Sequence, residues 1–322
     1  MHSPTDLLKR IEQAISTTQY PTYPASLYEP ISYIMSLGGK RIRPTMLLMA
    51  VDLFEGDLAA GIPAALAIET FHNFTLLHDD IMDNAPLRRG RETVHEKWGT
   101  NTAILSGDVM MVEANKHLTN VHLSVLKPAL DTFNITAQAV CEGQQLDMEF
   151  ETRDNVSIAE YIDMIRLKTA VLLGGAMKLG AIVSNATPEH AELIYQFGEN
   201  LGIAFQLQDD ILDVYGDPLK FGKQVGGDII SDKKTFLRLK LQEVAADEDL
   251  ALLNVQANNA DTANKIQVIT GLYDQYEIRM LASTRMKHYL DLAFQALAKI
   301  NTSEERKTEL INIANLLMNR EQ

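Results

Sequence analysis

Apolar residues recur every three or four positions along most of this 322-residue chain, whereas sustained strand-like alternation is hard to find. Short breaks rich in Gly, Pro, Asn or Asp separate the periodic segments. At one of them, Thr187 is the expected N-cap and Pro188 the expected first helical residue. The pattern therefore predicts one bundle of long helices. The clearest helices are expected near residues 60–85, 101–119, 130–150, 158–184 and 188–215.

The composition excludes several classes of protein. A net charge of -14 and a pI near 5.0 argue against a nucleic-acid-binding protein, because gripping a phosphate backbone requires a basic face. No stretch of about 18 apolar residues lacks charged or polar breaks, so no membrane span is expected. The lone Cys141 cannot form an internal disulfide, and the first residues do not resemble a secretory signal, which predicts a cytoplasmic protein.

An acidic motif of the form DDxxD occurs twice, each time within a strongly apolar helical segment. Asp79 and Asp83 are one helical turn apart in the first copy, about 40° from each other around the axis. Asp209 and Asp213 are the equivalent pair in the second copy. Like charges this close repel each other and require a cation. Oxygen ligands without a nearby cysteine favour Mg²⁺, which usually takes one or two carboxylates and leaves positions for water and substrate phosphate.

The plain alternative for a single such motif is a solvated helix face, since acidic residues are common on protein surfaces. Two copies in two very apolar helices favour the metal-binding interpretation over that alternative. A calcium loop of the EF-hand type fits poorly, because its ligands lie on a glycine-containing loop and not on a helix.

Basic residues cluster where an anion would bind. One group lies within residues 38–44 (GGKRIRP), and another, residues 88–91 (RRGR), follows shortly after the first aspartate motif. Arg grips phosphate oxygens with parallel hydrogen bonds, and Lys acts as a compact point charge. A solvated patch would explain any one group, but a diphosphate held between metal ions and cations explains all of them. Further cations lie near the second motif or in another long helix: Lys168, Lys223, Lys233 and Lys234.

Taken in order, these residues resemble the trans-isoprenyl diphosphate synthases, also called polyprenyl synthetases. The resemblance runs from Gly38 to about Lys234 and rests on the motifs GGKRIRP, HNFTLLHDDIMDNAPLRRG, SGD, GQQLD, KTA, FQLQDDILD and GKQVGGD. It implies a single polyprenyl synthetase domain over residues 1–322 with the all-α isoprenoid synthase fold, in which long, mostly antiparallel helices surround a central cavity. A homodimer is implied by the same resemblance.

The resemblance also assigns roles to the matching residues. The principal Mg²⁺ ligands would be Asp79, Asp83 and Asp209, supported by Asp80, Asp210 and Asp213, with three ions holding an allylic diphosphate. The residues matching contacts to that allylic diphosphate are Arg88, Lys168, Thr169, Gln206, Lys223 and Lys233. Those matching contacts to isopentenyl diphosphate are Lys40, Arg43, His72 and Arg89. The groups expected to carry catalysis are Asp79, Asp83, Arg88, Lys168, Asp209 and Lys223.

The implied reaction is a Mg²⁺-dependent trans-prenyl transfer. Isopentenyl diphosphate condenses head to tail with dimethylallyl, geranyl or farnesyl diphosphate, and diphosphate is released. The helix of the first motif is expected to limit the product: Thr75 and Phe74 lie four and five residues before Asp79, and Phe71 lies about 12 Å along the axis. An aromatic at the fifth position with a small residue at the fourth resembles synthases of C20 products. Geranylgeranyl diphosphate is therefore the expected product, with farnesyl diphosphate (C15) as the alternative.

Two rival functions stay open. A terpene cyclase is also an all-helical Mg²⁺ enzyme that ionises allylic diphosphates, but its second metal motif normally resembles NSE or DTE, unlike the DDILD of residues 209–213. A non-catalytic subunit of a heteromeric prenyl synthase is the other rival. The two intact aspartate motifs argue against it.

Overall fold

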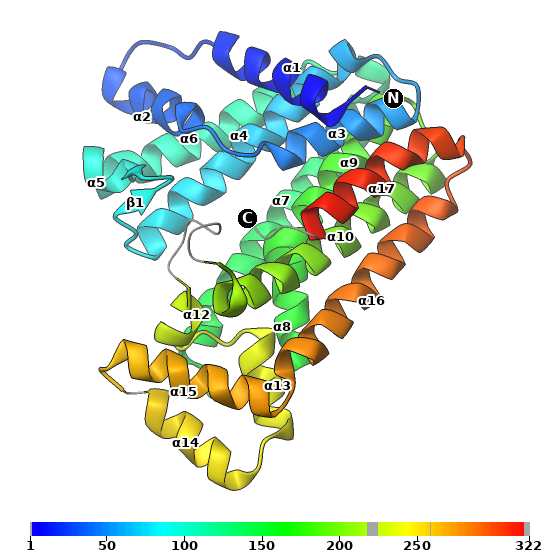
Figure 1. The fold of residues 1–322 in the computed structure, drawn as a ribbon. Coiled ribbons are helices and arrows are strands. Elements are labelled where there is room, and N and C mark those ends of the chain that lie inside the picture. Colours follow the sequence, from blue (N-terminus) through cyan, green and yellow to red (C-terminus); the bar gives the residue numbers. More distant parts are fainter. Residues whose placement is uncertain (1, 218–224, 258, 319–322) are drawn as a thin grey trace. The chain divides into compact units, whose positions relative to one another are not determined.

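The computed structural model describes residues 2–217, 225–257 and 259–318, and helices make up nearly all of it (Figure 1). Within these residues the only strands are β1 (Leu87–Arg88) and β2 (Arg91–Glu92), which pair as a short antiparallel hairpin. The all-α prediction is therefore confirmed. Within the same residues, none of the helices has the length and apolar character needed to cross a bilayer.

The chain divides into two compact units, each assembled from three separate stretches. Unit 1 comprises Met1–Ala137, Gly175–Tyr195 and Ile300–Leu310. Unit 2 comprises Gln138–Gly174, Gln196–Lys299 and Ile311–Gln322. A single domain over residues 1–322 stays a prediction.

The helices are distributed over both units. Unit 1 contains α1 (Pro4–Thr17), α2 (Ala25–Ser36), α3 (Ile42–Leu53), α4 (Leu58–Met82), α5 (Val94–Trp98) and α6 (Thr100–Leu118). Unit 2 contains α8 (Ile158–Ile165), the π-helical turn η1 (Arg166–Ala170), α12 (Gly227–Ile230), α13 (Phe236–Val244), α14 (Asp247–Ala257), α15 (Thr262–Gln275) and α16 (Ile278–Ala298). Both units receive residues from α7 (Leu123–Thr152), α9 (Val171–Val183), α10 (Pro188–Tyr215) and α17 (Glu304–Met318).

The expected helices near residues 60–85, 101–119, 130–150 and 188–215 correspond to α4, α6, α7 and α10. The start of α10 is as predicted, because the Thr187 hydroxyl accepts the His190 backbone N–H at 3.2 Å and Pro188 is the first helical residue. The segment expected to be helical at 158–184 is not one continuous α-helix. The turn η1 divides it into α8 and α9.

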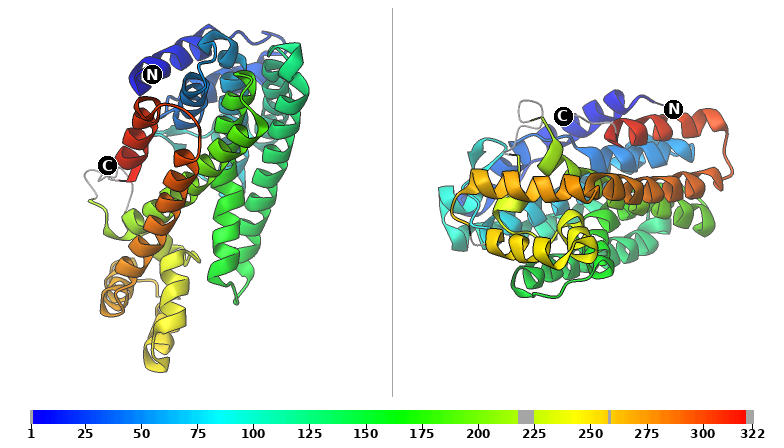
Figure 2. Two further views of the ribbon diagram at one scale, coloured as in Figure 1. Left: turned by 90° about the vertical axis from the view of Figure 1, so that its right-hand side faces the viewer. Right: turned by 60° about the horizontal axis from the view of Figure 1, so that its bottom comes forward.

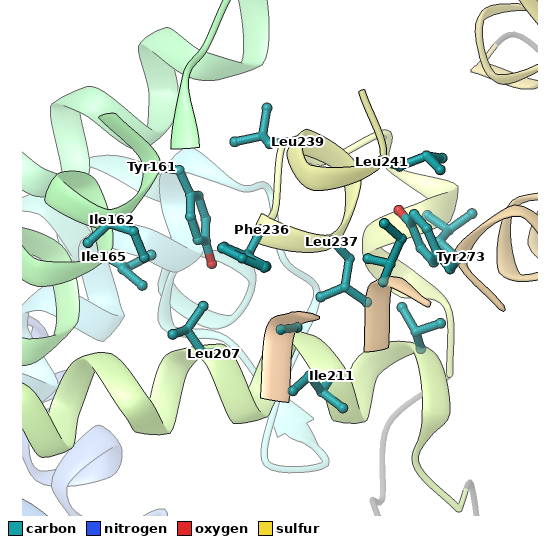
Figure 3. Close-up of a cluster of buried hydrophobic side chains, with 14 of the residues drawn as sticks. Tyr161, Ile162, Ile165, Leu207, Ile211, Phe236, Leu237, Leu239, Leu241 and Tyr273 are labelled. Atoms are coloured by element: carbon teal, nitrogen blue, oxygen red, sulfur yellow. The ribbon is translucent and has the colours of Figure 1, made fainter. Parts of the chain in front are cut away.

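The core of unit 1 surrounds α3, whose residues 45–53 are all buried. A helix that is apolar on all sides needs neighbours all round, and α4 packs against both α3 and α6 (Figure 1). Unit 2 has its own core, shown in Figure 3, in which the Tyr161 side chain lies beside Phe236 and Leu207. Within that unit α14 also packs against α15 (Figure 2).

Candidate active site

The first aspartate motif lies at the C-terminal end of α4. Asp83 is the C-cap, and its backbone N–H donates to the Asp79 carbonyl at 2.9 Å, so the two outer carboxylates are one turn apart. Asp79 is half-buried and Asp83 is exposed. A helix C-terminus carries partial negative charge, so carboxylates placed there are destabilised unless a cation lies close by.

The middle aspartate of this motif is bound by an arginine of the same unit. Asp80 is buried, and its two carboxylate oxygens lie 2.7 Å from Nε and from a terminal nitrogen of Arg88 on β1. Such a two-point contact fixes the orientation of a guanidinium group. The same arginine also lies 3.9 Å from Asp79. Asp80 therefore orients Arg88, and its predicted support of a metal ion stays a prediction.

The four residues predicted to bind isopentenyl diphosphate belong to unit 1. Arg43 lies 3.2 Å from His72 Nε2, and Arg89 donates to the Gly38 carbonyl. A Cβ on Gly39 would lie only 2.7 Å from the Arg89 guanidinium, so a glycine there lets the side chain lie against the loop. Lys40 is exposed beside it in the sequence.

The electrostatics of this basic group favour an anion. Burial lowers the pKa of His72 well below its usual value, and Arg43, Arg89, Arg88 and Arg41 lower it further. His72 is therefore neutral, and because an arginine can only donate, its Nε2 accepts from Arg43 and the ring proton is on Nδ1. Within the described part of the chain, the buried Nε of Arg43 has no hydrogen-bond partner. A buried donor of this kind suits a phosphate oxygen.

A buried ion pair that the sequence pattern did not reveal anchors this basic group. Arg41 is the N-cap of α3 in a left-handed conformation (φ 45°), and its guanidinium donates to Glu69 and, at 2.6 Å, to the Met35 carbonyl. Glu69 is only 1% exposed and also accepts from Asn73 at 2.9 Å. Arg41 thus turns into the protein although it lies within the GGKRIRP cluster. Only the burial of its partner on α4 distinguishes it from its basic neighbours.

The second aspartate motif lies on α10 and opens onto a cavity of about 170 Å³ within unit 2. Four of the residues predicted to bind the allylic diphosphate line this cavity: Lys168, Thr169, Gln206 and Lys233. Its acidic side chains are Asp147, Asp209, Asp210, Asp213 and Asp228. The structure thus brings together the predicted residues of this unit. Lys223 lies outside the described residues.

Asp210, the middle aspartate of the second motif, is also bound by its surroundings. It is buried, accepts the Tyr161 hydroxyl, and accepts the Gln206 amide at 3.2 Å. Burial raises the pKa of Asp210 to about 7, and the neighbouring charge of Asp228 contributes, while the two hydrogen bonds oppose the shift. Gln206 in turn accepts from Thr169 at 3.4 Å. Asp210 therefore organises two cavity residues, and its predicted role as a supporting ligand stays a prediction.

Asp213, the third aspartate, holds the start of α12. Its carboxylate accepts the Asp228 backbone N–H at 2.9 Å, and its carbonyl accepts the Gly226 N–H at 2.6 Å. This contact places the Asp228 side chain at the cavity. Asp228 is the last residue of the GKQVGGD motif, and the sequence alone does not reveal this role.

Asp147 neutralises the lysines of the cavity. Lys168 Nζ lies 2.5 Å from its carboxylate and Lys233 Nζ lies 4.0 Å away. Burial raises the pKa of Asp147, but the two lysines outweigh burial and hold it below its usual value. Lys234 is different, because its ammonium donates to the Phe150 carbonyl at 2.7 Å near the end of α7. Asp147 is the last residue of the GQQLD motif, and the motif alone does not predict this role.

The donors of unit 2 fit the predicted magnesium. Its cavity has five carboxylates against two lysines. Burial raises the pKa of Asp210, and repulsion by Asp228 adds to the shift. Among the described residues, no three carboxylate, imidazole or thiol groups form a ready-made metal site. Magnesium usually takes one or two protein carboxylates and completes its shell with water and substrate phosphate. Asp209 and Asp213 would hold it here, as would Asp79 and Asp83 on α4.

Two aromatic residues of α4, Phe71 and Phe74, lie in the turns before the first aspartate motif. Phe71 is fully buried and contacts Phe74 and Phe133, with ring centroids 5.6 and 5.5 Å apart. Phe74 also meets the His78 ring at 4.7 Å. Thr75 donates its hydroxyl to the His72 carbonyl at 2.8 Å. Phe71 and Phe74 thus pack against each other on α4, and the predicted role of Phe71, Phe74 and Thr75 in chain length stays a prediction.

Comparisons with known proteins give a consistent result. The sequence profile of the family described as polyprenyl synthetase matches residues 24–273. The chain is 36% identical over 314 residues to a geranylgeranyl diphosphate synthase of Methanosarcina mazei, covering 97% of this chain and 95% of the relative. It is 38% identical over 285 residues to one of Saccharolobus solfataricus, covering 87% and 86%. A solved structure of a geranylgeranyl pyrophosphate synthase matches with a TM-score of 0.95 and 40% identity over 100% of both chains.

The buried pair of Arg41 and Glu69 yields a prediction about stability. Glu69→Ala strands a buried guanidinium, and removing one partner of such a pair costs about 3–5 kcal/mol. The free energy of unfolding, measured by urea titration, should fall by about that amount. Glu243→Ala is the control, because Glu243 forms an exposed pair with Lys240 and should change stability by less than about 0.5 kcal/mol. Equal losses in the two variants would contradict the anchoring role of Glu69.

Proposed function

Because this chain belongs to the polyprenyl synthetase family, we propose that it is a magnesium-dependent trans-prenyltransferase whose main product is C20 geranylgeranyl diphosphate. Its substrates are isopentenyl diphosphate and the allylic diphosphates dimethylallyl, geranyl and farnesyl diphosphate. The observation that carries this proposal is the cavity of unit 2, where an excess of carboxylates is combined with two lysines. Three bound Mg²⁺ ions, a homodimeric state and a cytoplasmic location belong to the same proposal.

The reaction forms one carbon–carbon bond and breaks one carbon–oxygen bond. The allylic C1–O bond breaks, diphosphate leaves with the electron pair, and a delocalised allylic cation remains. The C4 double bond of isopentenyl diphosphate attacks C1, and loss of a proton from C2 restores an alkene. The released diphosphate is the proposed proton acceptor, because no side chain stands out as a dedicated base.

The cavity of unit 2 is proposed to hold the allylic diphosphate. Lys168 and Lys233 supply positive charge to its oxygens, and the Thr169 hydroxyl and Gln206 amide supply neutral hydrogen bonds. Bound magnesium neutralises the charge that develops on the leaving diphosphate. Asp147 keeps the lysines oriented before the substrate arrives, so little reorganisation is needed during the reaction. Arg88 and Lys223 are proposed to contact the same diphosphate.

The basic group of unit 1 is proposed to hold isopentenyl diphosphate. Arg43 and Arg89 supply charged donors, and Lys40 adds an exposed ammonium. A neutral His72 serves as a hydrogen-bond partner without adding to the repulsion among the arginines. Two separate diphosphate sites are what a condensation of two diphosphates requires, because each substrate must be held by its own charged end.

The first test is the reaction itself. Purified protein with Mg²⁺, isopentenyl diphosphate and dimethylallyl diphosphate should release diphosphate and yield mainly C20 product by mass spectrometry. Asp79→Asn and Asp209→Asn should each lower kcat by about 10²–10³-fold, the scale for losing one group that stabilises developing charge. Asp291→Asn is the matched control, because Asp291 forms an exposed pair with Lys287 and its loss should leave kcat unchanged.

The same assay separates the rival functions. Hydrocarbon formed from geranylgeranyl diphosphate alone would identify a terpene cyclase. Silence at adequate protein concentration, with activity restored by a second chain, would identify a non-catalytic subunit. Either result would reject the proposed condensation.

The product length is proposed to depend on the aromatic surface of α4. Phe71 is packed between Phe74 and Phe133, so the surface is rigid and its residues have little freedom to move aside. Thr75 is small and its hydroxyl is already bonded to the helix backbone. A growing chain that reaches this surface would stop there. The names of the Methanosarcina mazei and Saccharolobus solfataricus relatives agree with a C20 limit.

Shortening this surface should lengthen the product. Phe74→Ala and the milder Phe71→Leu remove atoms from the proposed floor, so products longer than C20 should appear by mass spectrometry. Phe54→Ala is the control, because Phe54 stacks on His190 instead of contacting the α4 aromatics. Unchanged chain lengths in both floor variants would reject this assignment.

The proposed homodimer has support on the surface of unit 1. Leu105 and Val112 are exposed on α6 and lie two helical turns apart, which places them on one face. Ile135 on α7 is 70% exposed. Contiguous patches of exposed apolar residues are typical of interaction surfaces, and we propose that these side chains contribute to one. A second copy of the chain is the proposed occupant.

A charge on this face should dissociate the dimer. The wild-type protein should sediment at about twice the 35.9 kDa chain mass, and Val112→Glu should shift it to the monomer mass because a buried carboxylate is costly. Val255→Glu, on the 69% exposed Val255 of α14, should leave the mass unchanged. A monomeric wild-type protein, or dissociation by both variants, would contradict the proposal.

A further inference from the structure

The π-helical turn η1 interrupts the long apolar segment that carries Lys168. It joins α8 to α9, and two of its residues, Lys168 and Thr169, line the cavity of unit 2. A π-helical turn is rare within an α-helix and is frequently found at functional sites. Because it changes the helical register locally, it decides which side chains of the segment point into the cavity.

Two glycines from two other helices border this turn. A Cβ on Gly143 of α7 would lie 2.2 Å from the Lys168 backbone nitrogen and 2.6 Å from the Leu167 carbonyl carbon. A Cβ on Gly202 of α10 would lie 2.6 Å from the Ala170 Cα. These are distances that real Cβ atoms essentially never show, and backbone atoms cannot rotate aside as a flexible side chain does. A larger residue at either position must therefore displace the turn.

One face of α7 contacts both the backbone and the ammonium group of Lys168. Gly143 lies against the Lys168 backbone, and Asp147, one helical turn further along α7, accepts the Lys168 ammonium at 2.5 Å. The backbone and the charged end of this lysine are thus both set by one helix. Movement of the turn would break this match even if Asp147 stayed in place.

We propose that Gly143 and Gly202 are positioning residues for the prenyl transfer. They allow η1 to pack against α7 and α10 at backbone distance, which determines where Lys168 and Thr169 enter the cavity. This inference rests on the proposed function, in which both residues hold the allylic diphosphate. Substitution of either glycine should therefore impair the use of one substrate and spare the other.

The main test is the steady-state kinetics of G143A and G202A in the full-length protein. A displacement of about 1 Å can cost about 10²-fold in rate, so kcat/KM for farnesyl diphosphate should fall by about 10–100-fold. KM for isopentenyl diphosphate should stay within about twofold, because its proposed contacts belong to unit 1 and not to the turn. Equal effects on both substrates, or no effect on either, would overturn the inference.

A double-mutant comparison shows whether Gly143 acts through Lys168. In a K168A background the lysine is already lost, so adding G143A should lower kcat/KM for farnesyl diphosphate by less than about threefold beyond K168A. If the two losses multiply instead, Gly143 does not act by positioning Lys168. G202A decides the question by the same comparison if G143A fails to fold, which circular dichroism would show.

Two glycine controls separate positioning from general strain. In Gly180→Ala the new Cβ would meet the Leu47 carbonyl oxygen at 2.3 Å, an equally severe clash within unit 1, and this variant should lose thermal stability without the substrate-selective loss. Gly271→Ala places a Cβ in open space and should behave as wild type. A substrate-selective loss in Gly180→Ala would overturn the inference. An inactive wild-type protein would reject the proposed function itself, whereas an active wild type with unaffected glycine variants would reject only this positioning role.

Discussion

Excess charge of one sign is the constraint on which the rest of this site depends. In unit 2 the carboxylates of the cavity outnumber its lysines, and burial together with Asp228 raises the pKa of Asp210 to about 7. In unit 1 burial lowers the pKa of the His72 imidazole well below its usual value, and the surrounding arginines lower it further. Like charges repel strongly where water is scarce. A metal cation would offset the excess of carboxylates in unit 2, and a diphosphate anion would offset the excess of arginines in unit 1.

The two DDxxD motifs divide their work in the same way. The outer carboxylates are one turn apart and share a face, whereas the middle one is rotated by about 100° and points toward the protein. Asp80 meets Arg88 there, and Asp210 meets Tyr161 and Gln206. In both motifs the middle aspartate therefore orients a neighbouring polar side chain. The repeated spacing thus combines ligand groups with the groups that support them.

Support for the site also comes from buried contacts that hold its loops. The pair of Arg41 and Glu69 anchors the left-handed residue that begins α3, between Lys40 and Arg43 in the sequence. Asp213 fixes the start of α12 and with it Asp228. Such contacts cost little reorganisation during a reaction, because they are formed before any ligand binds.

Periodicity was sufficient to predict the all-α fold and the start of α10 at Pro188. The paired DDxxD spacing and the basic clusters indicated metal and diphosphate sites, and these roles stay predictions. These features are local, since spacing along one helix determines which side chains share its face. The sequence could not distinguish Arg41, which turns into the core, from its basic neighbours. Nor could it identify Glu69 as the buried partner of Arg41, or Tyr161 as the buried partner of Asp210. It also could not predict the π-helical turn at Lys168 or its close approach to Gly143 and Gly202. Those features were decided by the tertiary structure, because they require backbone segments that are distant in sequence to approach each other, and spacing within one helix carries no information about that approach.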